Sequence, residues 1–235
     1  MKKEVEELRT YLQSLIDFTL PSYKELPSVD LYMEQVLKYV NDVLATLSLD
    51  QEKLLTSFMV NNYVKAKLID LPIKKKYNKD QIGYLMAICL IKSSLSMADM
   101  KLLLDMDVEI SKNKEELYAF WSKLQESMIK KVTIDVSSDI EESYKVTLNN
   151  DSLSIEEKEN SLRNSMALMA LRLSMMSSAY KLLADVILNS VREDSKCRAL
   201  EEAKEDVKKP IKQNKKKKTS IKKGELNMKG REFDD

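Results

Sequence analysis

The sequence predicts a mainly α-helical protein whose C-terminal part contains one long helix. The 235 residues include only 3 glycines and 4 prolines, so many tight β-turns are not expected. Aromatic residues make up 6% of the chain, whereas Met, Leu, Lys and Glu are abundant, a composition typical of helical proteins. Apolar residues also recur at helical spacing along most of the chain.

Six helices are expected before residue 132, each from apolar residues three or four positions apart. Their approximate ranges are 2–18, 30–47, 57–67, 79–93, 96–104 and 113–131. Thr56 can cap the third helix, and Asn78 with Gln81 forms a capping-box pair for the fourth. Ser96 with Asp99 repeats that signature before the fifth helix. The connection over residues 71–76 is expected to be short, basic and extended.

The segment 132–151 has no clear helical period. Val132, Ile134 and Val136 alternate with polar residues, which is compatible with a small hairpin, and a polar linker is the other alternative. A long helix is then expected over 154–207. The tail from Lys208 carries 11 Lys or Arg and 4 Asp or Glu, so it has a charge of +7 and is expected to be disordered. Since the whole chain has a charge of +1, the remainder has 1 − 7 = −6.

Several classes of chemistry are excluded or disfavoured by composition. The chain has no histidine, which excludes His-based triads and His metal sites. Cys89 and Cys197 lie far apart in sequence, and the three glycines cannot form a phosphate-binding loop. We therefore expect no catalytic residues, no metal and no cofactor, and the protein is not expected to be an enzyme.

The charge pattern bears on location. The first residues are charged throughout and lack the apolar stretch of a signal peptide. Arg172, Lys181 and Asp185 interrupt the least charged segment, where each would be costly inside a bilayer. We therefore expect no membrane association and a cytoplasmic location.

The helix expected over 57–67 has a polar face. Ser57, Asn61 and Lys65 follow one another at intervals of four residues, next to Asn62. Asparagine can bond adenine through two atoms and lysine can reach phosphate, so this face suits the major groove of DNA.

Six lysines follow within fifteen residues of an otherwise acidic body, at positions 65, 67, 74, 75, 76 and 79. Such a local cluster can bind phosphate, although a lysine run near a loop is more often only a solvated surface. The adjacency of the polar face and the lysines favours DNA binding. The candidate DNA-binding residues are Thr56, Ser57, Asn61, Asn62, Lys65, Lys67, Lys74, Lys75, Lys76, Tyr77 and Lys79.

The order Met59-Val60-Asn61-Asn62-Tyr63, Lys67-Leu68-Ile69, Pro72, Tyr77 and Leu95-Ser96-Met97 resembles the DNA-binding domain of MerR-type regulators over about residues 54–105. The segment 26–188 also resembles a bacterial family, mostly from Gram-positive species, known only as a domain of unknown function. The MerR resemblance implies a winged helix–turn–helix, with the lysine-rich connection as its wing. It also places Lys67 where MerR proteins have a turn glycine, which implies a left-handed backbone there.

Four segments are expected in this arrangement. They are an N-terminal helix at 1–25, the winged helix–turn–helix at 26–108, a helical dimerisation or effector domain at 109–207 and a basic tail at 208–235. The corresponding function is a dimeric, sequence-specific transcription regulator whose partners are double-stranded DNA, a second copy, and an unidentified small-molecule or protein effector. The alternative is a helical protein-interaction or adaptor module without DNA binding.

The long C-terminal helix is apolar on nearly all sides around residues 165–187. A helix apolar all round must be buried. An intramolecular core, a dimer interface and an effector pocket with adaptable methionine walls all remain open. The residues expected to serve as dimer interface or core are Met166, Met169, Leu173, Met176, Tyr180, Leu183 and Ile187.

Overall fold

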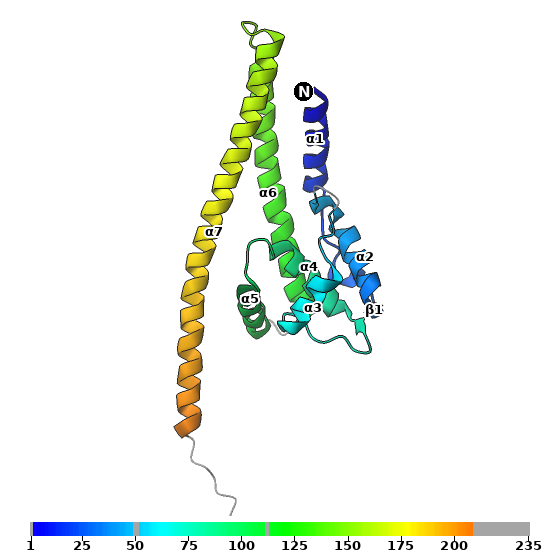
Figure 1. Ribbon diagram of the computed structural model, residues 1–235, viewed down its shortest axis with the longest axis vertical. Coiled ribbons are helices and arrows are strands. Elements are labelled where there is room, and N and C mark those ends of the chain that lie inside the picture. The colour runs from blue at the N-terminus through cyan, green and yellow to red at the C-terminus, as the bar shows by residue number, and fades with distance from the viewer. Residues whose placement is uncertain (1, 49–51, 111–112, 209–235) are drawn as a thin grey trace, which may run out of the picture. The chain divides into compact units, whose positions relative to one another are not determined.

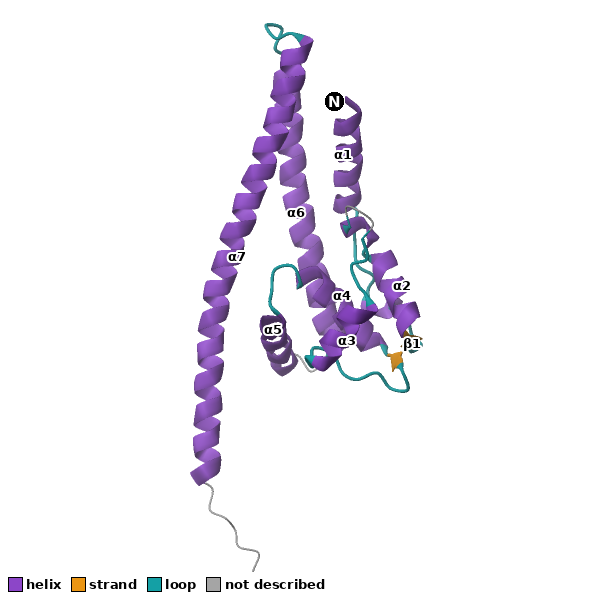
Figure 2. Cartoon of the chain, viewed as in Figure 1, coloured by secondary structure: helices purple, strands orange, loops and turns teal. Residues whose placement is uncertain are grey.

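A computed structural model describes residues 2–48, 52–110 and 113–208, and it is mainly helical, as the sequence predicts (Figures 1 and 2). The helices are α1 (Lys2–Ile16), α2 (Met33–Val43), α3 (Ser57–Lys65), α4 (Lys79–Ile91), α5 (Met97–Ile110), α6 (Lys114–Leu148) and α7 (Ile155–Lys208). Two short 3-10 turns, η1 (Tyr23–Glu25) and η2 (Ala45–Leu47), and two strands, β1 (Leu31–Tyr32) and β2 (Lys76–Tyr77), complete the element order. The expected basic tail lies outside the described residues.

The chain divides into two compact units, residues 1–188 and 189–235. The first unit contains everything up to the greater part of α7. The described part of the second unit is the C-terminal end of α7, as far as Lys208.

Helix α4 is the centre of the core. Asn78 caps it as expected, because its side chain accepts from the Gln81 N–H at 3.0 Å while Gln81 Oε1 accepts from the Asn78 N–H at 2.9 Å. Helix α4 is apolar enough to be buried on almost every side. Helices α2, α3 and α5 each contribute apolar side chains to the core around it. The fully buried residues of this core include Val36, Val40, Leu44, Leu55, Val60, Ile82, Leu85, Met86 and Ile88.

The two strands form a minimal antiparallel sheet that was not expected from the sequence. Leu31 pairs with Tyr77 and Tyr32 pairs with Lys76. The pairing joins the segment before α2 to the segment before α4, so it fixes the start of α4 against α2.

Helix α6 corrects the interpretation of residues 132–151, because it continues to Leu148 without a hairpin or linker. The reason is packing on α1. Thr133, Ile140 and Thr147, each seven residues apart, are buried on one face of α6. On that side Arg9 of α1 donates from Nε to Glu141 at 2.6 Å, and its guanidinium lies 4.9 Å from the centre of the Tyr144 ring.

The long helix expected over 154–207 is confirmed as α7. Ser154 caps it, with its backbone N–H donating to Glu157 at 2.8 Å and its hydroxyl accepting from the Glu157 N–H at 3.3 Å. Among the described helices, none is both long enough and apolar enough to cross a membrane.

Candidate nucleic-acid interface

Helix α3 is held by its N-cap and by a two-way amide link to α2. Thr56 caps α3 as expected, its hydroxyl accepting from the Met59 N–H at 3.3 Å. Just before it, the Asn41 side chain accepts from the Leu55 N–H and donates to the Leu55 carbonyl, both at 2.9 Å. Val60 and Tyr63 are then buried on the inner face of α3, which sets the rotation of the helix.

The expected polar face points outward. Ser57, Asn61 and Lys65 are exposed, and Asn62 is half-buried. Phe58, which was not among the candidate residues, lies on the same side with 73% of its surface exposed. An apolar ring therefore interrupts the polar strip. Phe58 lies three residues before Asn61, so its place on this face could have been predicted from the sequence.

The turn that follows α3 closes as a Schellman motif with lysine in the place that glycine usually occupies. The Leu68 N–H donates to the Tyr63 carbonyl at 2.9 Å and the Lys67 N–H to the Val64 carbonyl at 3.0 Å. Lys67 has φ 57°, so the left-handed backbone expected there is confirmed. Leu68 is buried next to the helix end, and the Lys67 side chain is exposed.

The lysine-rich connection is a tight hairpin turn. Ile73 and Lys76 exchange two backbone hydrogen bonds, at 3.0 and 2.9 Å. Between them Lys74 and Lys75 have φ 51° and 64°. Positive φ at both central residues is the signature of a type I′ turn, in which asparagine and glycine are the favoured residues. Both lysine side chains are exposed, so the tip of the hairpin carries two charges.

Three further candidates either contact aromatic rings of the same chain or are buried. Lys76 lies 4.9 Å from the centre of the Tyr32 ring, and Lys79 lies 4.6 Å from the centre of the Tyr23 ring. Tyr77 is only 3% exposed, and burial raises the pKa of its hydroxyl. We therefore assign Tyr77 to the core and remove it from the candidate DNA-binding residues.

Four lysines remain free to act on a ligand. Lys65, Lys67, Lys74 and Lys75 are exposed, and none of them has an ion-pair partner within the described ranges. From Lys67 to Lys74 the chain can span at most about 24 Å, because each residue adds at most about 3.4 Å. We call the exposed side chains of Ser57, Asn61, Lys65, Lys67, Lys74 and Lys75 the lysine surface.

Apolar side chains border the lysine surface. Leu71 and Ile73 are 77% and 70% exposed, on the connection that leads to the hairpin turn. Together with Phe58 they are unusual for a purely polar recognition face, and they bear on the choice between nucleic acid and protein as the partner.

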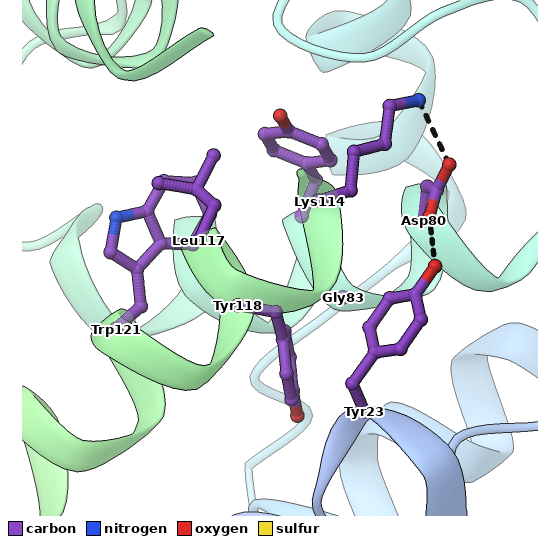
Figure 3. Close-up of a pocket in the computed structure, with 8 residues that line it drawn as sticks. Tyr23, Asp80, Gly83, Lys114, Leu117, Tyr118 and Trp121 are labelled. Carbon is purple, nitrogen blue, oxygen red and sulfur yellow. Dashed lines mark hydrogen bonds and ion pairs between the residues drawn. The ribbon is translucent and has the colours of Figure 1, made fainter. Parts of the chain in front are cut away.

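A hydrogen-bonded group of three side chains anchors the start of α4 (Figure 3). The Tyr23 hydroxyl donates to Asp80 Oδ1 at 2.5 Å, and Lys114 Nζ donates to Asp80 Oδ2 at 2.8 Å. These bonds connect η1, α4 and α6. Because Asp80 binds it and burial adds to the effect, the pKa of Tyr23 is raised to about 12.

Partial burial raises the pKa of Asp80, but the bonds from Lys114 and Tyr23 lower it by more, and it lies below the ordinary 3.8. A cavity of about 10 Å³ between Asp80, Tyr84, Tyr118 and Trp121 has room for a single water, so the group has a structural role. Within the described residues, no group of three Cys, Asp or Glu side chains is arranged to hold a metal ion.

Comparison with known protein families corrects one expectation. Residues 21–126 match a family described as a domain of unknown function (DUF1836). No match to a MerR-like helix–turn–helix family accompanies it, so the MerR assignment was wrong. The match includes α2, α3, the hairpin turn and α4, and it ends within α6, well before the residue 188 expected from the resemblance. No curated protein and no solved structure matches the chain.

The residues expected on α7 separate into two groups. Met166 and Met169 line a cavity of about 10 Å³ with Val5 of α1 and Ile140 of α6, and Leu173 is half-buried. Met176, Tyr180, Leu183 and Ile187 are between 39% and 66% exposed. That cavity has no room for an effector, so Met166 and Met169 pack against α1 and α6 there.

Proposed function

We propose that this protein is a DNA-binding transcription regulator that contacts duplex DNA through the lysine surface. The observation that carries the proposal is the backbone conformation of Lys67, Lys74 and Lys75, all at positive φ. A side chain with a Cβ is disfavoured there, by about 1 kcal/mol or more per residue. Strained positions of this kind cluster at functional sites. Here these backbone conformations place the side chains of Lys67, Lys74 and Lys75 at the tips of two turns.

The division of roles follows from chemistry. Lysines at turn tips bind phosphates without regard to sequence and provide affinity that depends on salt. Asn61 and Ser57 on α3 are the groups that can read base edges, since an asparagine amide can both donate to and accept from adenine. A homodimer would offer two copies of α3 to a palindromic site.

Sequencing the DNA fragments that copurify with the full chain tests the proposal. We expect one enriched motif, and we expect the purified protein to bind a duplex with that motif more tightly than a scrambled duplex. Asn61→Ala should reduce the preference for the motif while leaving the affinity for scrambled DNA unchanged. Equal binding of both duplexes by the wild type would refute sequence-specific recognition.

The second candidate is a protein-interaction module, and the exposed Phe58, Leu71 and Ile73 favour it. Aromatic and large aliphatic side chains rimmed by polar groups are typical of protein interfaces. The two functions differ in their dependence on salt. DNA binding weakens steeply as salt is raised, whereas binding through these apolar side chains is expected to change little.

A further inference from the structure

We propose that a second copy of this chain packs against the exposed half of α7, along an apolar seam that begins inside the protein's own core. The inference deepens the dimeric regulator proposed above by assigning the surface through which the dimer forms. It rests on the spacing, burial and exposure of apolar residues on α6 and α7.

The seam has an unbroken heptad spacing. Its residues, which we call the α7 seam, are Leu162, Met166, Met169, Leu173, Met176, Tyr180, Leu183 and Ile187. The intervals alternate between four and three residues from start to end. This is the a/d spacing by which helices pack in coiled coils. The next two positions, Ser190 and Asp194, are polar, so the seam ends at Ile187.

The first half of the seam is already covered by the protein's own helices. Leu162 is 7% exposed, and Met166 and Met169 meet Val5 of α1 and Ile140 of α6 around a cavity of about 10 Å³. Here α7 therefore packs against other helices through the a/d positions, which shows the kind of partner that the seam accepts.

The second half continues in the same register but is exposed. Tyr180, Leu183 and Ile187 have 66%, 59% and 64% of their surface exposed, and Met176 has 39%. Leu188, directly after the seam, is buried, so among the described residues this stretch of α7 packs within the chain through another face and leaves most of the half-seam uncovered. A seam with one spacing and two degrees of burial indicates that its second half is covered by something other than the described part of the chain.

Helix α6 carries a matching apolar strip. Phe120, Leu124, Met128 and Val132 follow at intervals of four residues and are 47–59% exposed. Side-chain bonds join α6 and α7 over the part that includes the connecting loop, from Lys158 to the Leu148 carbonyl and from Arg172 to Asp139, at 2.8 and 2.7 Å. Away from the loop the helices diverge (Figure 1). Because they run antiparallel, the α6 strip lies at the level of the exposed half of the seam.

The area and the geometry favour a second copy over a short peptide. The eight side chains of the strip and the half-seam are 39–66% exposed, which makes a patch on the order of the ~800 Å² that each partner buries in a stable interface. Two apolar strips on diverging helices are complementary to the same pair on a second chain related by a two-fold axis. The product is a four-helix bundle in which α7 of each copy packs between α6 and α7 of the other.

Sedimentation equilibrium of the full chain, without DNA and at micromolar concentration, tests the proposal. The wild type should have twice the 27.2 kDa mass of the chain. Tyr180→Glu/Leu183→Glu should sediment as a monomer, because two uncompensated carboxylates in an apolar interface should raise the dimer Kd by roughly 1,000-fold. Tyr180→Ala/Leu183→Ala, which keeps the helix favourable, should raise it by about 30-fold or more.

Ser174→Glu is the matched control. Ser174 lies on α7 between the two halves of the seam but on the opposite face, where it is exposed. This variant should remain a dimer, and circular dichroism should show equal helicity in all four proteins. A monomeric wild type, or a dimer that both double variants leave intact, would overturn the proposal. A protein that dimerises here but fails to bind duplex DNA would instead refute the regulator function alone.

Discussion

Lys74 and Lys75 occupy the two central positions of one hairpin turn, and both have the left-handed backbone that asparagine and glycine adopt most easily. Stability and function therefore place opposite demands on these two residues. Lys74→Asn/Lys75→Gly should raise the free energy of unfolding by about 1–2 kcal/mol, since the turn type is kept and strain is relieved. Urea denaturation measures it, and an unchanged or lower stability would argue against a strained turn.

The same turn makes a prediction about DNA binding. Lys74→Gln/Lys75→Gln should weaken binding to all duplexes and reduce the slope of log K against log salt by about 2, because each lost phosphate contact contributes about 0.9. Lys123→Gln/Lys130→Gln is the control, as it removes two exposed charges from α6. Fluorescence anisotropy over a salt series measures both. Equal slopes for the two variants would exclude the hairpin from the interface.

Local signals of the sequence predicted much of this structure. The caps at Thr56, Asn78 and Ser96 depend on residues within three positions, and they begin helices where expected. The positive φ at Lys67 was expected only from a family resemblance that proved wrong in its assignment. The expected backbone was nevertheless correct, because the turn that ends α3 and buries Leu68 needs a left-handed residue just before Leu68.

Tertiary contacts decided what local patterns could not. The alternation of Val132 and Ile134 suggested a strand, yet both are exposed on a helix whose buried face is set by α1. Strand β1 has two residues, too few for any period, and exists because Leu31 meets Tyr77. The same pairing buries Tyr77, which the sequence alone placed among the DNA contacts. The exposure of half the α7 seam could not be predicted from the sequence either, because the apolar residues keep the same spacing along the whole seam.

Asp80 should make stability depend on acid pH. Its pKa lies below 3.8 in the folded protein, so its contribution is fully present above about pH 3.8 and is lost as the pH falls through the folded pKa. At neutral pH Asp80→Asn should lower the free energy of unfolding by about 1–3 kcal/mol, through loss of charge-assisted hydrogen bonds to Tyr23 and Lys114.

Urea denaturation at a series of pH values checks this. The difference between wild type and Asp80→Asn should be constant from pH 7 to about 5 and should shrink below pH 3.8. Tyr23→Phe, which keeps the carboxylate, should lose about 1 kcal/mol and keep most of the acid dependence. A difference that stays constant into acid would mean that the folded protein does not stabilise the Asp80 carboxylate.

Gly83 should resist replacement even though it lies inside a helix, where alanine is normally the more stable residue by about 0.5–1 kcal/mol. A Cβ at this position would lie 3.0 Å from Cδ2 and 3.3 Å from Cε2 of the Tyr118 ring. That ring cannot easily move, because its hydroxyl donates to the Pro21 carbonyl at 2.9 Å and its centre lies 6.0 Å from that of the Tyr23 ring. Gly83→Ala should therefore lower the free energy of unfolding by about 1–2 kcal/mol, as in other overpacked cores.

A double-mutant cycle separates the clash from the helix preference. Tyr118→Leu removes the ring atoms that Cβ would meet, so adding Gly83→Ala to that variant should be neutral or stabilising. The coupling free energy between the two positions should then be about 1–3 kcal/mol, measured by urea denaturation of the four proteins. If Gly83→Ala destabilises both backgrounds equally, the close approach of α4 to the Tyr118 ring is not what requires glycine at this position.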